Sequence, residues 1–388
     1  MGGVSMEWKE VRLGDVIRTN ESQYSIREHW DNFVYLDTGS LTNGHIDSLL
    51  YFNKNDKLPS RARRKVKQGD ILYSCVRPNQ RHYGYIDNPI SNLLVSTGFV
   101  VITCKDIDSK YLYYYLGQES TVNYLQNLGE QSVSTYPTIK PQDIEDLNIL
   151  LPSNLEDQRR IASILSSLDR KIELNNKINA DLEEMAQAIF KNWLSECTDE
   201  VTIGELSLNI TNYEKTNAEE VVLINSSDVT EGYFDHHDYS PNKNLKGHFK
   251  KRFQKGDILY SQVRPRNRHW AYCNFDANDY LASTQLMVIR NNPSLITSIL
   301  LYQYIISDNV WKEFTLKTET RSGTFPQGNY EDLSQIRVPY NSDVKGISNQ
   351  LETLYAKMFM LEKENSRLSL LRDTLLPRLM SGEIEVPQ

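Results

Sequence analysis

The sequence predicts an α+β protein in which two mixed α/β domains, related by a pseudo-twofold repeat, are separated by two long helices that form an antiparallel coiled coil. Two long heptad seams predict the helices. A duplicated segment predicts two equivalent domains, because self-similarity at a fixed period marks repeated structural units. Short apolar runs bounded by Gly, Asn, Asp or Pro predict the strands.

The helices follow from alternating steps of four and three residues, the a/d spacing of a coiled coil. A single seam is equally compatible with a core helix of an ordinary bundle, whereas two matched seams favour pairing with each other. If Ile161 lies opposite Leu379, Asn175 faces Asn365, and buried Asn at such positions fixes register. The two seams are Ile161, Leu165, Leu168, Ile172, Asn175, Asn179, Leu182, Ala186, Ile189 and Trp193, and then Ile347, Leu351, Leu354, Met358, Leu361, Asn365, Leu368, Arg372, Leu375 and Leu379.

Local signals mark the helix ends. Ser153 as N-cap with Glu156 three residues on forms a capping box that starts the first helix. The segment 341–343 is the equivalent start of the second. Pro377 is expected to kink or end the second helix, and Gly382 to stop it.

The rest of the chain repeats at a shift of 187 residues. The run Gly69-Asp70-Ile71-Leu72-Tyr73-Ser74 returns from Gly256 to Ser261, and Arg81-His82 returns as Arg268-His269. The predicted organisation is a first domain at 1–151, a helix at 152–196, a second domain at 197–340, a helix at 341–382 and a tail at 383–388.

Each domain is expected to be weighted towards β-structure. Predicted strands of the first domain are Val34–Leu36, Ile71–Ser74, Leu93–Thr103 and Asp146–Leu150. Tyr111–Leu125 and Ile296–Phe314 have mixed helical spacing, and each predicts a helix against its sheet.

Composition sets limits on the class of protein. With 39% hydrophobic and 24% charged residues and no apolar run approaching the ~18 residues of a membrane span, a globular protein is expected. The start of the sequence has no signal-peptide pattern, and the four cysteines form no CxxC. A reducing, cytoplasmic setting fits these features.

Charge is distributed unevenly in this chain of net charge −8. Residues 55–85 hold eight Lys/Arg against two Asp, and residues 243–270 hold nine against one. An isolated charge run is usually a solvated loop, but these two runs recur at the same place in the repeat. They therefore indicate a surface that binds a polyanion.

The residue types in these runs suggest two kinds of contact with DNA, one to bases and one to phosphates. Arg can pair with guanine and Asn or Gln with adenine in the major groove, whereas Lys and Arg suit phosphates. Pro78 and Pro265 should stiffen the loops that present the side chains. The candidate DNA-binding residues are Arg61, Arg63, Arg64, Lys65, Lys67, Arg77, Asn79, Gln80, Arg81 and His82 in the first half, and Lys250, Lys251, Arg252, Arg264, Arg266, Asn267, Arg268 and His269 in the second.

A structural alternative is that Arg77 and Arg264 form ion pairs with Asp70 and Asp257 or with other acids. No catalytic motif accompanies the basic runs: Walker A, GxSxG and HExxH patterns are missing, and no zinc pattern is present. Asp70 and Asp257 lack the Lys partner of a nuclease site, and we interpret them as turn residues beside Gly69 and Gly256. The sequence predicts a binding protein that is not an enzyme and that holds neither metal nor cofactor.

The chain resembles the DNA-specificity subunits of type I restriction-modification systems. The resemblance lies in the two Gly-Asp-Ile-Leu-x-Ser-x-x-Arg segments, each followed by Pro and a heptad helix, and in the segments Leu151–Ala162 and Leu375–Gly382. It covers almost the whole chain. It implies two target-recognition domains, each reading one half of a bipartite double-stranded DNA site, with the helices setting the gap.

The resemblance also implies partners. They are two adenine methyltransferase subunits that carry S-adenosylmethionine and an ATP-driven restriction and translocase subunit. Candidate partner-binding residues on the first helix are Asp157, Gln158, Arg159, Arg160, Glu183 and Glu184. The second helix starts Val344-Lys345-Gly346-Ile347 without the Asp-Gln-Arg-Arg of the first, so a contact made by 157–160 is not expected twice.

Two alternatives remain open at this stage. One is a stand-alone DNA-binding regulator or decoy without methyltransferase partners. The other is a nuclease with an unrecognised site.

Overall fold

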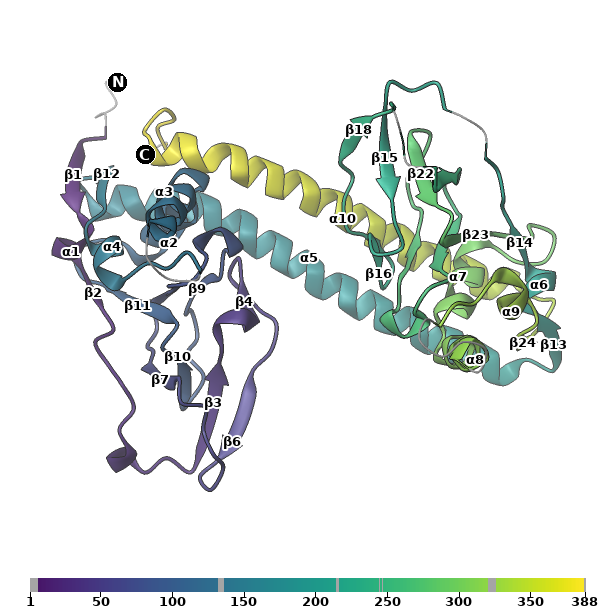
Figure 1. Ribbon diagram of the computed structural model, residues 1–388, viewed down its shortest axis with the longest axis horizontal. Coiled ribbons are helices and arrows are strands. Elements are labelled where there is room, and N and C mark those ends of the chain that lie inside the picture. Colours follow the sequence, from purple (N-terminus) through teal and green to yellow (C-terminus); the bar gives the residue numbers. More distant parts are fainter. Residues whose placement is uncertain are drawn as a thin grey trace. The chain divides into compact units, whose positions relative to one another are not determined.

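The chain divides into two compact units, each built from one α+β domain and a part of each long helix. A computed structural model describes residues 6–131, 136–213, 216–243, 245, 247–319 and 326–386 (Figure 1). Unit 1 comprises Met1–Leu174 and Glu364–Gln388, and unit 2 comprises Asn175–Lys363. In the described residues, no helix is both long and apolar enough to cross a membrane.

The domain of unit 1 consists of short strands followed by a helical segment. Its strands are β1 (Trp8–Arg12), β2 (Ile17–Thr19), β3 (Asn32–Leu36), β4 (Leu41–Thr42), β5 (His45–Ile46), β6 (Leu50–Asn53), β7 (Ala62–Lys65), β8 (Ile71–Ser74), β9 (Tyr83–Tyr85), β10 (Leu93–Ser96), β11 (Phe99–Cys104) and β12 (Asn148–Pro152). Its helices are α1 (Leu13–Val16), α2 (Ser109–Gly117), α3 (Glu119–Glu130) and α4 (Pro141–Glu145), with 3-10 turns η1 (Ile26–Glu28), η2 (Thr38–Ser40) and η3 (Pro78–Gln80).

Two four-stranded sheets form this domain, in the orders β6-β3-β10-β7 and β2-β11-β8-β9. The pair β3–β10 is parallel, and the other pairs of these sheets are antiparallel. A cluster that includes Leu36, Leu72 and Phe99 joins residues from both sheets. A second cluster joins Tyr73 and Tyr111 to Ile161 on the first long helix, so the domain packs on that helix through an apolar core.

The domain of unit 2 repeats this order of elements. Its strands are β13 (Asp199–Thr202), β14 (Ser207–Asn209), β15 (Glu220–Ile224), β16 (Val229–Thr230), β17 (Tyr233–Phe234), β18 (Tyr239–Pro241), β19 (Phe249–Lys251), β20 (Ile258–Ser261), β21 (Trp270–Tyr272), β22 (Tyr280–Ser283), β23 (Leu286–Asn291) and β24 (Arg337–Tyr340). Its helices are α6 (Ile203–Leu206), α7 (Ser298–Ile306), α8 (Asp308–Glu319) and α9 (Tyr330–Ser334), with the 3-10 turn η4 (Pro265–Asn267).

The sheet orders are also the same, β18-β15-β22-β19 and β14-β23-β20-β21, with one parallel pair, β15–β22. The duplication predicted from sequence is therefore present in the topology.

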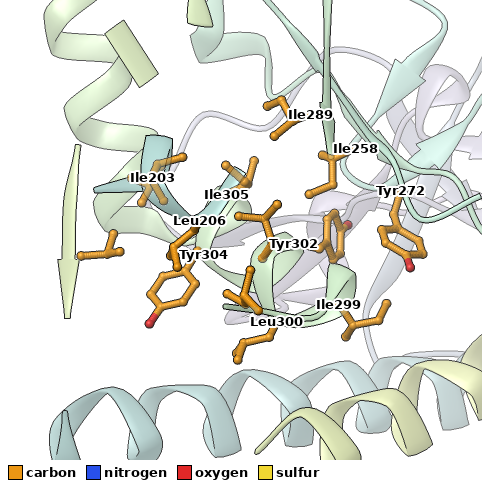
Figure 2. Packing of buried hydrophobic residues seen from close by; sticks show 14 of the residues in the cluster. Ile203, Leu206, Ile258, Tyr272, Ile289, Ile299, Leu300, Tyr302, Tyr304 and Ile305 are labelled. Carbon is orange, nitrogen blue, oxygen red and sulfur yellow. The ribbon is translucent and has the colours of Figure 1, made fainter. Parts of the chain in front are cut away.

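Figure 2 shows how the core of unit 2 is layered. Ile258 and Ile289 of the sheet lie on one side of α7, and Ile299 and Leu300 lie on the side of α7 that faces the long helices.

Two long helices, α5 (Leu155–Glu196) and α10 (Lys345–Met380), run antiparallel within each unit. In unit 1 the Asp169 carboxylate pairs with Arg372 at 2.8 Å, and Lys171 pairs with Glu364 at 3.5 Å. In unit 2 the Nδ2 of Asn179 donates to the carbonyl of Met358 at 3.3 Å. Residue numbers thus fall along α10 as they rise along α5, which confirms the predicted direction. The pairing of Asn175 with Asn365 stays a prediction.

Four local expectations were wrong. The predicted strand Leu93–Thr103 is two strands, β10 and β11, which belong to different sheets. The N-cap of α5 is Asn154 and not Ser153, because the Asn154 side chain accepts the N–H of Glu156 at 2.9 Å. The predicted helices 111–125 and 296–314 are each two helices, broken where Gln118 and Ser307 take extended backbone angles (ψ 142° and 143°).

Pro377 does not end α10, which continues to Met380. A proline removes one backbone donor and crowds the carbonyl four residues earlier. So close to the end of the helix only one hydrogen bond is affected. Leu379 and Met380 are buried (2% and 3% exposed) in the core of unit 1, and their burial holds the last turn in place. Gly382 follows with a positive φ of 74°, as expected for a helix stop.

The repeated Gly-Asp pair forms the same turn in both units, as predicted. Gly69 and Gly256 have φ of 88° and 92°, a region that favours glycine. Asp70 accepts the N–H of Lys67 at 2.9 Å, and Asp257 accepts the N–H of Gln254 at 2.8 Å. The remaining carboxylate oxygens differ in their partners: Asp70 accepts from the Thr103 hydroxyl, whereas Asp257 forms a two-point ion pair with Arg290.

This difference predicts unequal effects for one substitution. Asp257→Asn leaves the Arg290 guanidinium beside a buried neutral group and should lower the free energy of unfolding by about 2 kcal/mol. Asp70→Asn should cost less than about 1 kcal/mol, since an amide can keep both hydrogen bonds. Burial also raises the pKa of Asp70, so its ionised form is less favoured in the fold than in water. Urea unfolding of both variants measures the difference, and equal losses would contradict this account.

Candidate nucleic-acid interface

Two loops with the same backbone follow the central strands β8 and β20. We call residues 75–82 the first arginine loop and residues 262–269 the second arginine loop. In the first, the Ser74 hydroxyl donates to the carbonyl of Val76 and accepts its N–H, at 3.0 and 3.1 Å. Ser261 makes the same two bonds with Val263, at 3.0 and 3.1 Å. Both loops therefore leave their strands at the same place and with the same turn.

Each loop holds two arginines in the left-handed region of backbone angles. Arg77 and Arg264 both have φ of 49°, and Arg81 and Arg268 have φ of 55° and 54°. A non-glycine residue in this region costs on the order of 1 kcal/mol or more. Such strain persists only where the surroundings enforce it, and it gathers at functional sites. The N–H of Arg77 donates to Pro137 at 2.9 Å and that of Arg264 to Pro326 at 3.0 Å, which holds the loops in this conformation.

The Arg77 guanidinium lies over the ring of Tyr136 at 4.2 Å. Asp70 accepts from the Thr103 hydroxyl and Asp257 pairs with Arg290, so these two carboxylates are held by other partners than Arg77 and Arg264. Tyr136 was not singled out in the sequence, because nothing near it in the chain points to the arginine it meets. Asn79, Gln80, Arg264, Arg266 and Asn267 are exposed, which leaves their side chains accessible to a ligand, although Arg266 also pairs with Glu319.

The repeated Arg-His dipeptide instead holds the fold together. The Arg81 guanidinium donates to the Gly117 carbonyl at 3.1 Å and pairs with Glu119, the first residue of α3. The Arg268 guanidinium pairs at 3.3 Å with Asp308, the first residue of α8. Both arginines therefore tie their loop to the start of a helix.

The histidines of the dipeptide contact the backbone of a neighbouring strand. The Nδ1 of His82 lies 2.7 Å from the Leu41 carbonyl, and that of His269 lies 2.8 Å from the Val229 carbonyl. Arg81, His82, Arg268 and His269 were predicted to contact DNA. Their side chains are engaged within the fold, and the prediction stays untested for them.

The basic residues before β8 divide into two groups. Lys65 pairs with Glu28 at 2.8 Å and Lys67 with Glu21 at 3.5 Å. Arg64 is half-buried, and burial lowers the pKa of its guanidinium. Arg61 and Arg63 are exposed, and Arg63 donates only to the Ser60 carbonyl among the described residues. The exposed pair is the better candidate for phosphate contacts.

The equivalent run in unit 2 behaves similarly. Lys250 is exposed, whereas Lys251 is 5% exposed and its ammonium donates to the Leu286 carbonyl at 2.6 Å. Burial lowers the pKa of Lys251. Arg252 donates to the Asn278 carbonyl. Lys251 is therefore a core residue, and a phosphate contact through its ammonium does not fit its position.

The partner-binding candidates also differ in accessibility. Gln158 is 1% exposed, donates to the Pro152 carbonyl at 2.8 Å and accepts the N–H of Asp108 at 2.9 Å, so it fastens α5 to the domain. Arg160 lies 3.4 Å from Asp157 within the same turn. Arg159 and Glu184 are exposed. Glu183 is half-buried and lines a pocket of unit 2.

Comparisons with known proteins agree with this architecture. Residues 6–184 match the family model described as "Type I restriction modification DNA specificity domain". The specificity subunit of type I restriction enzyme HindI from Haemophilus influenzae is 35% identical over 189 residues, which is 48% of this chain and 40% of that protein. The specificity subunit of the MjaIX enzyme from Methanocaldococcus jannaschii is 23% identical over 100% of this chain and 96% of that protein.

The fold is shared with a solved structure. The type I restriction-modification S subunit from M. genitalium has a TM-score of 0.58 and 15% identity, with 97% of each chain covered. Residues 6–184 are thus similar to a type I restriction-modification DNA specificity domain, and the two relatives named above are specificity subunits of type I restriction enzymes. The chain spans 40% of the first of these relatives and 96% of the second.

Proposed function

We propose that this chain selects the DNA sequence on which a type I restriction-modification complex acts. The domain of unit 1 reads one half of a bipartite site and the domain of unit 2 reads the other. The helices α5 and α10 set the gap between the two halves. Specificity subunits are the non-catalytic components of these systems, so the chemistry belongs to other subunits.

The two arginine loops are the observation that carries this proposal. Their backbones match residue by residue, including four arginines at φ between 49° and 55°. Their exposed side chains differ, with Asn79 and Gln80 in one loop and Arg266 and Asn267 in the other. Guanidinium and amide groups can each form two hydrogen bonds with a base edge. One scaffold with two sets of side chains suits two domains that read different sequences.

The partners follow from the family. The chain would assemble with two adenine methyltransferase subunits, which carry S-adenosylmethionine, and with an ATP-driven translocating nuclease, and would itself hold no cofactor. The complex would act on DNA in the cytoplasm. Arg159 and Glu184 are exposed on α5 and are the candidates for docking of these partners, although the Arg159 guanidinium also lies 3.8 Å from Asp108 and 3.7 Å from Glu156.

Substitution of one arginine in each loop tests the proposal. With the methyltransferase present, the wild-type chain should direct adenine methylation to a bipartite motif in host DNA. Arg77→Ala should relax or abolish recognition in one half of that motif, and Arg264→Ala in the other half. The loss of one base contact corresponds to about 1–3 kcal/mol of discrimination. Methylation sequencing of host DNA gives the motif for each variant.

Two matched controls remove the same charge from a strand. Arg18→Ala changes β2 in unit 1, where the guanidinium donates to the Ile17 carbonyl, and Arg337→Ala changes β24 in unit 2, where it lies 3.9 Å from Glu200. Both controls should leave the motif unchanged. The proposal fails if Arg77→Ala and Arg264→Ala alter the same half, or if neither alters the motif while methylation continues.

A further inference from the structure

A segment from further along the chain lines the first arginine loop. The N–H of Arg77 donates to the Pro137 carbonyl at 2.9 Å, and the N–H of Ile139 donates to the Cys75 carbonyl at 2.8 Å. These two bonds flank an antiparallel bridge between residues 76 and 138. The short ladder fixes the register of the two segments, and Tyr136, the residue before Pro137, lies at the strained arginine.

The second arginine loop has the same ladder. The N–H of Arg264 donates to the Pro326 carbonyl at 3.0 Å, next to an antiparallel bridge between residues 263 and 327. In the sequence an aromatic residue precedes the proline in both halves, as Tyr136-Pro137 and Phe325-Pro326. Phe325 lies outside the described residues. The two residue types share the ring and not the hydroxyl, which indicates that the ring is the required feature.

The ring of Tyr136 and the guanidinium of Arg77 form a stack at the surface of unit 1. The guanidinium carbon lies 4.2 Å from the ring centroid, and Tyr136 is 51% exposed. The face of an aromatic ring attracts a cation, and at an exposed site this attraction corresponds to a change of about two- to fivefold in an equilibrium. The stack therefore biases the position of the guanidinium without burying the pair in the core.

Stacking through one face leaves the hydrogen-bond donors of a guanidinium available. The five N–H groups lie in its plane and point outward from its edges. Among the described residues, no carboxylate forms an ion pair with Arg77. Arg268 shows the other arrangement, because its guanidinium lies over Trp311 at 4.4 Å and also pairs with Asp308 at 3.3 Å. The donors of Arg268 are engaged within the fold, whereas those of Arg77 suit a base edge.

The Arg77 side chain is held at both ends. Its backbone is fixed in the left-handed region at φ of 49°, and its guanidinium rests on the Tyr136 ring. An unrestrained arginine side chain loses rotamer freedom when it forms two hydrogen bonds with a base. Ordering the side chain before DNA binds reduces this loss and favours the base edge that matches the fixed fork of donors.

We propose that Tyr136 is a positioning residue for DNA recognition. Its ring holds the Arg77 guanidinium in the orientation that reads a base in the half-site of unit 1. The ring acts through Arg77 and makes no base contact of its own. The role of Tyr136 rests on the proposed function, in which Arg77 reads that base.

Methylation sequencing with the partner methyltransferase tests this role at the base position that Arg77→Ala relaxes. The measured quantity is the ratio of correct to incorrect bases at that position among the methylated sites. Tyr136→Ala and Tyr136→Leu should each lower this ratio about two- to fivefold, because both remove the ring and the leucine keeps the apolar bulk. Tyr136→Phe should keep the wild-type ratio, because the ring remains.

Tyr124→Ala is the matched control, since it removes a ring of similar exposure (56%) from α3 of the same unit. It should leave the ratio unchanged. The double variant Arg77→Ala/Tyr136→Ala should be no more relaxed than Arg77→Ala alone, because the group that the ring positions is already missing. The salt dependence of DNA binding by the Tyr136→Ala complex should equal that of the wild type, since no phosphate contact is removed.

The possible failures can be told apart. If Tyr136→Ala and Tyr136→Leu keep the wild-type ratio while Arg77→Ala lowers it, the role of Tyr136 is refuted and the proposed function stands. The role is also refuted if Tyr136→Phe is as relaxed as Tyr136→Ala, which assigns the effect to the hydroxyl. A double variant more relaxed than Arg77→Ala refutes it as well, because the ring would then contact DNA itself. If Arg77→Ala leaves the motif unchanged, both the role of Tyr136 and the reading of a base by Arg77 are refuted.

Discussion

The apolar seam of α5 and α10 is the feature on which both units depend. Ile161 and Leu379 are buried in the core of unit 1, and Ala186 and Leu351 are buried in the core of unit 2. Each fully buried Ile or Leu side chain of this kind contributes roughly 1.5–3 kcal/mol. Neither domain can complete its core without residues from both helices. The helices are therefore part of the folding unit of each domain, which makes them suited to act as a spacer.

A rigid loop on each domain can present a few side chains to DNA, and little conformational entropy is lost on binding. The repeated Arg-His dipeptide ties each arginine loop to a helix start and to a strand, through contacts such as Arg81 with Glu119 and Arg268 with Asp308. The backbone strain at Arg77 and Arg264 is sustained by their N–H bonds to the carbonyls of Pro137 and Pro326. Fixed residues thus hold the loop, and the exposed residues beside them are free to vary with the DNA sequence that is read.

Much of the fold could be predicted from sequence because it rests on periodicity and repetition. The helix seams, the duplicated domains and the turn at Asp70 and Asp257 are local patterns. The split of each predicted helix and the use of Asn154 as N-cap depend on small differences between competing local geometries. The sequence could not show which basic residues are exposed and which are engaged within the fold, because this depends on partners far away in the chain. The buried Lys251 ammonium donates to the Leu286 carbonyl, and Arg81 pairs with Glu119.

The central claim is that the length of the helices sets the spacing of the recognised half-sites. Insertion of one heptad after Leu174 and another after Lys363 keeps both seams in phase and lengthens each helix by about 10 Å, the rise of about three base pairs. Methylation sequencing with the partner methyltransferase should return both wild-type half-sites with a gap longer by about three base pairs. An unchanged gap, or altered bases in either half-site, would contradict the account.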